Sequence, residues 1–231
     1  LPNARALADA TGLRISEIEA SGTIAVCKYH RLMVISPLAA VNGYDWANTL
    51  AHEFTHLVIS KRTKNKIPIW LHEAIAKYFE SLWSGKAGQA LSPFGEKLLK
   101  EATAERAWIT FDQMHPSMAK LPNQKSATLA FAEVFTVVEF LQKRYGKDII
   151  ATILRHVGEG VLLEEAFNKT TGLNLKALEV RWQKYLEKRK FTIRPGAVAR
   201  TIQFVESSDD DIGKEGSLEA IPERRVHEHS R

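Results

Sequence analysis

The sequence predicts an α+β domain that is mainly helical and carries a small β-sheet near its N-terminus. Apolar residues recur with helical spacing over most of residues 46–189, whereas only two short runs, residues 23–27 and 32–35, have strand-like composition. The chain has 231 residues, of which 45% are hydrophobic and 26% charged. These values are typical of a globular protein with a substantial core. The single cysteine, Cys27, excludes an intrachain disulfide and a cysteine-based metal cage.

We expect one folded domain over residues 1–190, in which a β-containing part, residues 1–60, precedes a helical part, residues 61–190. In the first part, residues 3–19 have helical spacing that Gly12 weakens, and the two strands follow as a hairpin or as neighbours. Asp45 is a suitable N-cap for a helix over residues 46–60.

The helical part begins with a basic loop, residues 61–66, and Pro68 suits the first turn of a helix that ends at Gly85. A short helix is expected near residues 96–106. Gly146, the Gly158–Gly160 turn and Gly172 then separate the four helices of a C-terminal bundle, at residues 126–145, 147–157, 161–169 and 174–189. We expect the five tryptophans to pack in the core or at interfaces: Trp46, Trp70, Trp83, Trp108 and Trp182.

Residues 191–231 differ in composition from the rest of the chain. They contain no Trp or Tyr and include the run Asp209-Asp210-Asp211, so we expect a linker or a flexible tail. Their net charge is −2, which leaves +7 on residues 1–190 and +5 overall, with a pI of about 9.2. Charge alone does not indicate a base-reading surface, and we expect no nucleic-acid partner. No apolar run is long enough for a membrane-spanning segment.

The chemically informative motif is His52-Glu53-Phe54-Thr55-His56, which lies inside the amphipathic stretch 46–60. Positions i and i+4 of a helix share a face, so both imidazoles can bind one metal ion. Glu53 is placed to take a proton from a metal-bound water. Glu73, on the next helix, is a suitable third ligand, because two helices joined by a short loop pack antiparallel. The alternative is a pair of semi-buried histidines without a metal.

Residues 67–80, with Trp70, Glu73, Ala74 and Tyr78, resemble the third-ligand helix of the gluzincin metallopeptidases. Together with the His-Glu-x-x-His motif, this stretch resembles the peptidase MA-like domain family of bacterial proteins. The later stretches 131–146 and 178–186 are similar to the C-terminal helices of that family. The resemblance covers roughly residues 20–190 and implies a zincin-like fold.

The resemblance implies that His52, His56 and Glu73 bind one Zn²⁺ ion and that Glu53 is the general base of a zinc metallopeptidase. Ala74 departs from the family, which usually has Gly there, and its methyl group narrows the space beside Glu73. The family often has Tyr near the position of Phe131, and Phe cannot donate a hydrogen bond to an oxyanion.

The sequence leaves several supporting roles open. The candidates for an additional oxyanion donor are His115, Tyr44 and Tyr78. Asn48 and Glu80 each lie on the same helix face as a proposed ligand and can accept an imidazole N–H. His72 points about 100° away from Glu73 and is a poor co-ligand.

Two classes of function remain in view. The first is a zinc-dependent peptidase acting on peptides or proteins. The second is a zinc-stabilised scaffold with little or no activity, which binds protein partners through helical-repeat segments fused to it. The chain begins at Leu1 and shows no signal peptide, and we expect it to be a piece of a longer chain. The resemblance suggests a bacterial envelope or secreted location.

Overall fold

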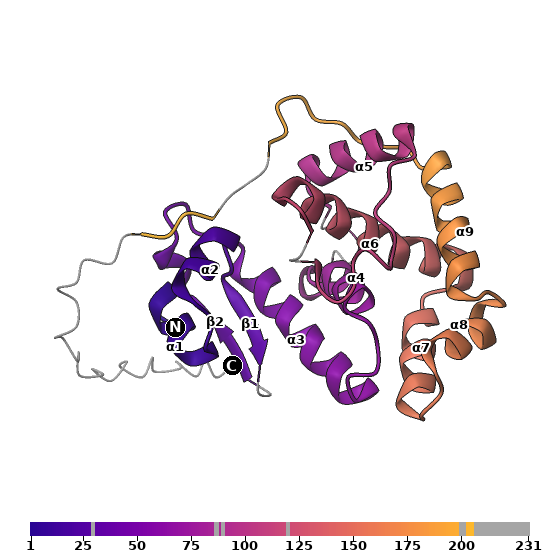
Figure 1. The fold of residues 1–231 in the computed structure, drawn as a ribbon, viewed down its shortest axis with the longest axis horizontal. Coiled ribbons are helices and arrows are strands. Elements are labelled where there is room, and N and C mark those ends of the chain that lie inside the picture. The colour runs from indigo at the N-terminus through magenta and orange to yellow at the C-terminus, as the bar shows by residue number, and fades with distance from the viewer. Residues whose placement is uncertain (29–30, 86–87, 89–90, 119–120, 199–201, 206–231) are drawn as a thin grey trace, which may run out of the picture.

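The structure, a computed structural model, describes residues 1–28, 31–85, 88, 91–118, 121–198 and 202–205. These residues are mainly helical and form a single two-stranded sheet, which confirms the coarse α+β class. Figure 1 shows the N-terminal elements grouped on one side, the C-terminal helices on the other, and α3 between the two groups. None of the helices in the described part is both long and apolar enough to cross a membrane.

The first fifth of the chain forms two helices and a hairpin. In place of one helix over residues 3–19, the structure has α1 (Ala4–Thr11) and α2 (Ile15–Ser21). Gly12 separates them because it adopts the left-handed conformation, with φ of 72°. The predicted strands are β1 (Ala25–Lys28) and β2 (Arg31–Val34), which pair antiparallel. The residues at the tip of the hairpin, 29–30, lie outside the described part.

The helices α3 (Trp46–Thr63) and α4 (Ile69–Phe79) form the centre of the molecule. The Asp45 side chain caps α3 by accepting from the backbone N–H of Asn48, as the sequence predicts. Lys64 and Asn65 follow α3 with φ of 53° and 58°. Two successive left-handed residues reverse the chain, so that α4 returns alongside α3.

The four helices predicted for the C-terminal bundle are present with bounds that differ by a few residues. The remaining elements are η1 (Pro37–Ala39), η2 (Leu82–Ser84), α5 (Pro93–Glu105), α6 (Gln124–Tyr145), α7 (Ile149–Gly158), α8 (Leu163–Thr171) and α9 (Leu175–Lys188). The main core lies between α4, α6 and the later helices. Trp182 is completely buried there and donates a hydrogen bond to Thr136, whereas Trp46 and Trp83 are exposed and do not belong to the core.

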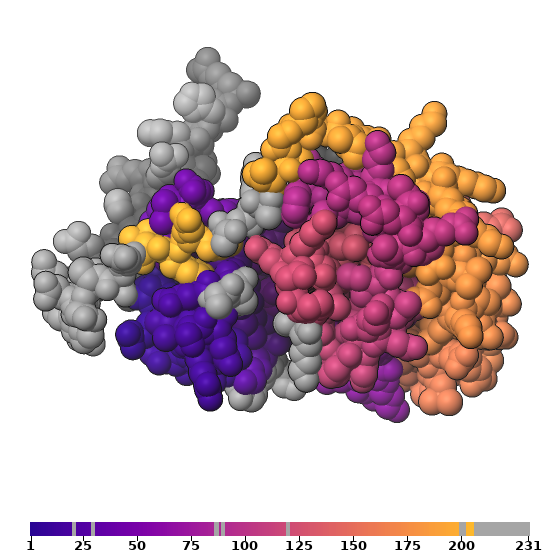
Figure 2. Space-filling view, turned by 45° about the horizontal axis from the view of Figure 1, so that its top comes forward, coloured from indigo at the N-terminus to yellow at the C-terminus, as the bar shows by residue number. Residues whose placement is uncertain are grey.

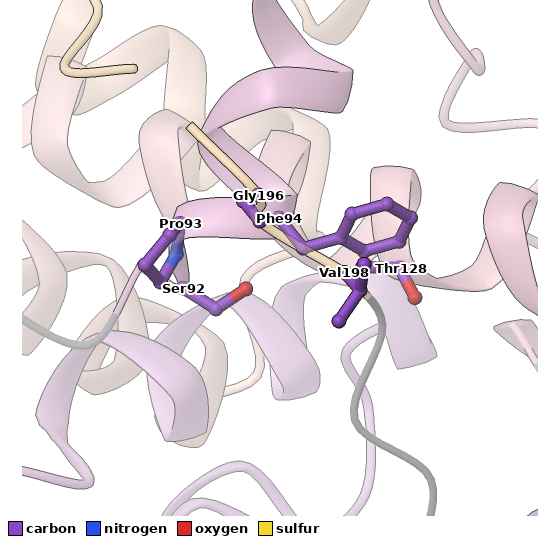
Figure 3. A pocket seen from close by; sticks show the side chains of 7 residues that line it. Ser92, Pro93, Phe94, Thr128, Gly196 and Val198 are labelled. Carbon is purple, nitrogen blue, oxygen red and sulfur yellow. The ribbon is translucent and has the colours of Figure 1, made fainter. Parts of the chain in front are cut away.

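Part of the segment expected to be a linker or flexible tail packs on the folded chain. Residues 196–198 lie beside Ser92 and Thr128 and enclose a hollow of about 400 Å³ with the start of α5 (Figure 3). Farther on, Val41 and Val205 donate backbone hydrogen bonds to Gln203 and Ala39. Figure 2 shows residues 202–205 against the N-terminal elements. Residues 206–231 lie outside the described part.

Glu133 is a completely buried carboxyl group in the middle of α6. Its oxygens accept the backbone N–H of Ile109 at 3.1 and 3.3 Å. Burial raises its pKa well above the usual value, the Ile109 N–H lowers it, and Glu179 raises it further. The unfolded chain therefore loses this proton at a lower pH than the folded chain, so ionisation of Glu133 favours unfolding as pH rises.

We expect Glu133→Gln to become more stable relative to the wild type between pH 5 and pH 7. The relative gain is up to about 1.4 kcal/mol for each pH unit over which folded Glu133 keeps its proton. Denaturant unfolding of both proteins at the two pH values measures the difference. The same change with pH in both proteins would show that Glu133 is ionised in the folded chain.

Candidate metal centre

Helix α3 places two imidazoles one turn apart on the same face. The Nε2 atoms of His52 and His56 are 3.1 Å apart. A ligand atom of Glu53 lies within 4.8 Å of a ligand atom of each histidine. Asp45 fixes where the helix begins, and Ile59, buried in the core, fixes which face turns inward.

Helix α4 brings the carboxylate of Glu73 to the same point. Its Oε2 atom is 3.3 Å from His52 Nε2, and its Oε1 atom is 3.6 Å from His56 Nε2. Ligand atoms around a tetrahedral zinc ion at about 2.0–2.1 Å are separated by about 3.3 Å. Two imidazole nitrogens and one carboxylate oxygen are also ligands that zinc prefers. The residues present therefore fit a zinc ion, and their side chains are 15–16% exposed, which leaves access for a water or a substrate.

The outer nitrogen of His52 has a carboxylate partner. Glu80 Oε2 lies 3.1 Å from His52 Nδ1, and Glu80 Oε1 accepts from Lys77 Nζ at 2.5 Å. Such a carboxylate holds the imidazole ring in place and fixes its tautomer, so that Nε2 is free to bind a metal. Asn48, the other candidate for this role, is used elsewhere, because its carbonyl oxygen accepts from the Trp83 indole and its amide donates to Asp45.

Glu80→Ala is expected to weaken zinc binding by about 10–100-fold, because His52 loses the partner that orients its ring. Glu80→Gln is expected to lose less zinc affinity, because its amide oxygen can still accept a hydrogen bond from Nδ1 of His52. Competition with a chromogenic chelator measures both affinities, and Glu101→Ala, on the surface of α5, serves as the control. An unchanged affinity in Glu80→Ala would rule out this role.

The carboxylate of Glu53 is held by the hairpin. It accepts the backbone N–H of Cys27, in β1. Burial raises the pKa of Glu53, and the positive charge of His52 and His56 and the hydrogen bond from Cys27 act in the opposite direction. A raised pKa brings a carboxyl group nearer to neutral pH, where a general base exchanges protons most effectively.

His52 and Glu73 form a strongly coupled pair in the absence of metal. Burial alone would lower the pKa of His52, but hydrogen bonds to Glu73 and Glu80 outweigh it and raise the pKa to about 9. Burial alone would raise the pKa of Glu73, but hydrogen bonds from His52 and His56 lower it to about 2. The pair therefore stabilises the metal-stripped protein, and protonated His52 must lose its proton before it can bind zinc.

The stability of the metal-stripped protein and the additional stability contributed by zinc are expected to respond oppositely to pH between 6.5 and 9. The folded pKa of His52 is raised, so its contribution is complete below pH 6.5 and is lost as pH rises through 9. The metal-stripped protein should lose stability over this range. The stability gained on adding zinc should instead increase, because the His52 proton that competes with zinc is lost as pH rises. Thermal unfolding with chelator or with zinc measures both. A zinc increment that falls as pH rises would contradict this account.

Two neighbours of Glu73 are held in the core. Ala74, where the resemblance predicts Gly, is completely buried. His72 is also buried, with its ring centroid 5.6 Å from that of His56. Burial lowers the pKa of His72 to about 4, and the nearby His56 acts in the same direction. His72 is therefore neutral at physiological pH.

Two of the three candidate oxyanion donors are engaged elsewhere. The Tyr44 hydroxyl donates to the backbone oxygen of Ile35. The Tyr78 ring packs on Phe79 and Phe135, and its hydroxyl faces Gly88. His115 is exposed, and its role stays a prediction.

Two hollows flank the three candidate ligands. One, of about 330 Å³, is lined by His52, Glu80 and Lys77 among others. The other, of about 570 Å³, is lined by Glu73 and by Met118, three residues after His115. Phe131 lines both hollows, so the aromatic residue where the family often has Tyr lies beside the site.

Two residues that support the site, Lys77 and Cys27, have little or no sequence signature. Lys77 lies on the same helix face as Glu73 and Glu80. This spacing is the only feature of the sequence that indicates its ion pair with Glu80. The contact between Glu53 and Cys27 uses the backbone of Cys27 and has no sequence signature.

Comparison with known proteins identifies a family for this chain. A family model described as the peptidase MA superfamily matches residues 4–188. Searches of curated proteins and of solved structures give no significant match. The family model agrees with the resemblance stated from residues 52–56 and 67–80.

Proposed function

Because the chain belongs to the peptidase MA superfamily, we propose that it is a zinc-dependent metallopeptidase of the gluzincin type. The observation that supports this most strongly is the convergence of three residues. The Nε2 atoms of His52 and His56 lie 3.1 Å apart, and each lies 3.3–3.6 Å from one of the two carboxylate oxygens of Glu73. In the metal-free protein His52 shares its proton with Glu73, and a metal ion would take the place of that proton. The superfamily indicates a peptide or protein substrate.

In this proposal each residue has a distinct task. His52, His56 and Glu73 hold the ion, and Glu80 orients His52. A zinc ion bound there would lower the pKa of a coordinated water and polarise the carbonyl group of the substrate. Glu53 accepts a proton from the attacking water and delivers it to the nitrogen of the departing amine. The N–H of Cys27 keeps the Glu53 carboxylate in position between these two transfers.

The flanking hollows provide room for the substrate on both sides of the site. The hollow beside Glu80 is lined by the charged Lys77. The larger hollow beside Glu73 is lined by apolar residues and by polar ones, which are Thr23, Ser117, Asn123 and Gln124. We therefore expect a peptide to extend across the candidate ligands with one side chain in each hollow.

The test combines metal analysis with cleavage of a peptide library. Protein purified without added metal should contain close to one equivalent of zinc or bind one on titration. The protein should cleave a subset of the library, lose this activity with a chelator, and regain it with zinc. Absence of zinc binding would disprove the metal site. Stoichiometric zinc without cleavage of any peptide would favour the scaffold function.

A further inference from the structure

A second hollowed surface lies on the side of α3 that faces away from the candidate ligands. Trp46, Leu50 and Phe54 follow one another at intervals of four residues, and Trp46 and Phe54 are each 55% exposed. Leu82 and Trp83, in η2, continue this apolar surface and are 55% and 62% exposed. Large apolar side chains that gather in this way typically mark an interaction site.

This surface contains a groove of about 550 Å³, which we call the α3–α7 groove. Phe54 and Trp83 form part of its walls, and the buried side chains of Ile59, Ile75 and Leu154 form its floor. The volume falls in the range of about 300–1,000 Å³ that is typical of ligand sites. Phe54 is two positions from His52, which places it about 200° around the helix, so an occupant leaves the candidate metal centre open.

The charged side chains that line the groove are all basic. Arg62, in the last turn of α3, and Lys147, just before α7, both line it, and no carboxylate does. Both side chains are exposed, and neither pairs with an acidic group in the part of the chain that the structure describes. An occupant with carboxylates beside its apolar residues would therefore be complementary to this groove.

The elements that line the groove determine how an occupant can bind. They are mainly helices, α3, α4, η2 and α7, whose backbone groups are largely used in their own hydrogen bonds. The groove therefore offers no free strand edge, and recognition must come from side chains. An amphipathic helix satisfies this condition, because its apolar side chains can enter the groove while its own backbone groups stay hydrogen-bonded.

We propose that the α3–α7 groove docks an acidic amphipathic helix of a partner protein. Apolar side chains of the partner helix enter the groove between Phe54 and Trp83, and its carboxylates face Arg62 and Lys147. The proposal does not depend on the proposed peptidase activity.

The test uses a fluorescent helical peptide of about 15 residues, with leucines on one face and glutamates on the other. A second peptide has lysine in place of every glutamate. We expect the acidic peptide to bind the full chain saturably, with at least about tenfold higher affinity than the basic peptide. Phe54→Ala should weaken binding by about tenfold or more. The double variant Arg62→Glu, Lys147→Glu should reverse the preference between the two peptides.

Matched controls separate the groove from the rest of the surface. Val180→Ala removes another exposed apolar side chain and Lys176→Glu reverses another exposed charge, both on α9, and neither should change binding. Circular dichroism verifies that each variant is folded. Equal binding of both peptides, or binding unchanged in Phe54→Ala, would overturn the proposal. If the wild type forms dimers that Phe54→Ala dissociates, the groove binds a second copy of the chain and the proposal is overturned. If the protein binds anionic phospholipid vesicles but not the peptides, the groove binds a membrane and the proposal is likewise overturned.

Discussion

Glu53→Gln is expected to lower the rate of peptide cleavage by about 10³-fold while leaving zinc binding intact. Glutamine has nearly the shape of glutamate and can still accept the N–H of Cys27, but it cannot take a proton from water at neutral pH. The pKa of Glu53 is raised by burial, which suits a group that both accepts and returns a proton. Single-turnover cleavage and metal analysis of the same preparation measure the two effects.

The control for Glu53→Gln is a carboxyl group outside the site. Glu101→Gln, on the exposed surface of α5, should match the wild type. If Glu53→Gln cleaves peptides at the wild-type rate, another residue is the general base. If Glu53→Gln loses its zinc, the carboxylate of Glu53 takes part in metal binding.

Glu73→Ala is expected to abolish stoichiometric zinc binding and, with it, cleavage. Its two oxygens face both Nε2 atoms, at 3.3 and 3.6 Å, so its loss removes one of three ligands. Loss of a residue that only orients a ligand, such as Glu80, costs at most about 100-fold in zinc affinity. We expect Glu73→Ala to lower the affinity by more than this. Isothermal titration with zinc measures it.

The comparison between Glu73→Ala and Glu80→Ala separates a ligand from a residue that orients one. Glu80→Ala should still reach one equivalent at high zinc concentration, whereas Glu73→Ala should not. Equal affinities in the two variants would mean that Glu73 does not coordinate the ion.

The centre of the site was predictable because its geometry is local. The pair His52 and His56 follows from the helical period, and Glu73 follows from a short loop that returns the next helix alongside the first. The helices of the C-terminal bundle were predictable because their apolar faces are amphipathic and glycines separate them.

Features that depend on distant contacts were not predictable. Phe204 packs against the N-terminal core through an isolated bridge to Ala40, and no pattern around residue 204 signals it. The exposure of Trp46 and Trp83 depends on what covers α3, which is a property of the tertiary structure. By contrast, the break between α1 and α2 is indicated locally by Gly12. Its left-handed conformation ends α1 even though the residues around it have helical spacing.

We propose that His52, His56 and Glu73 together bind one zinc ion. The most direct measurement is a crystal structure of the zinc-loaded protein with anomalous diffraction collected at the zinc edge. We expect one anomalous peak within about 2.0–2.2 Å of both Nε2 atoms and of a Glu73 oxygen. A peak bound by other residues, or no peak between these three at saturating zinc, would contradict it.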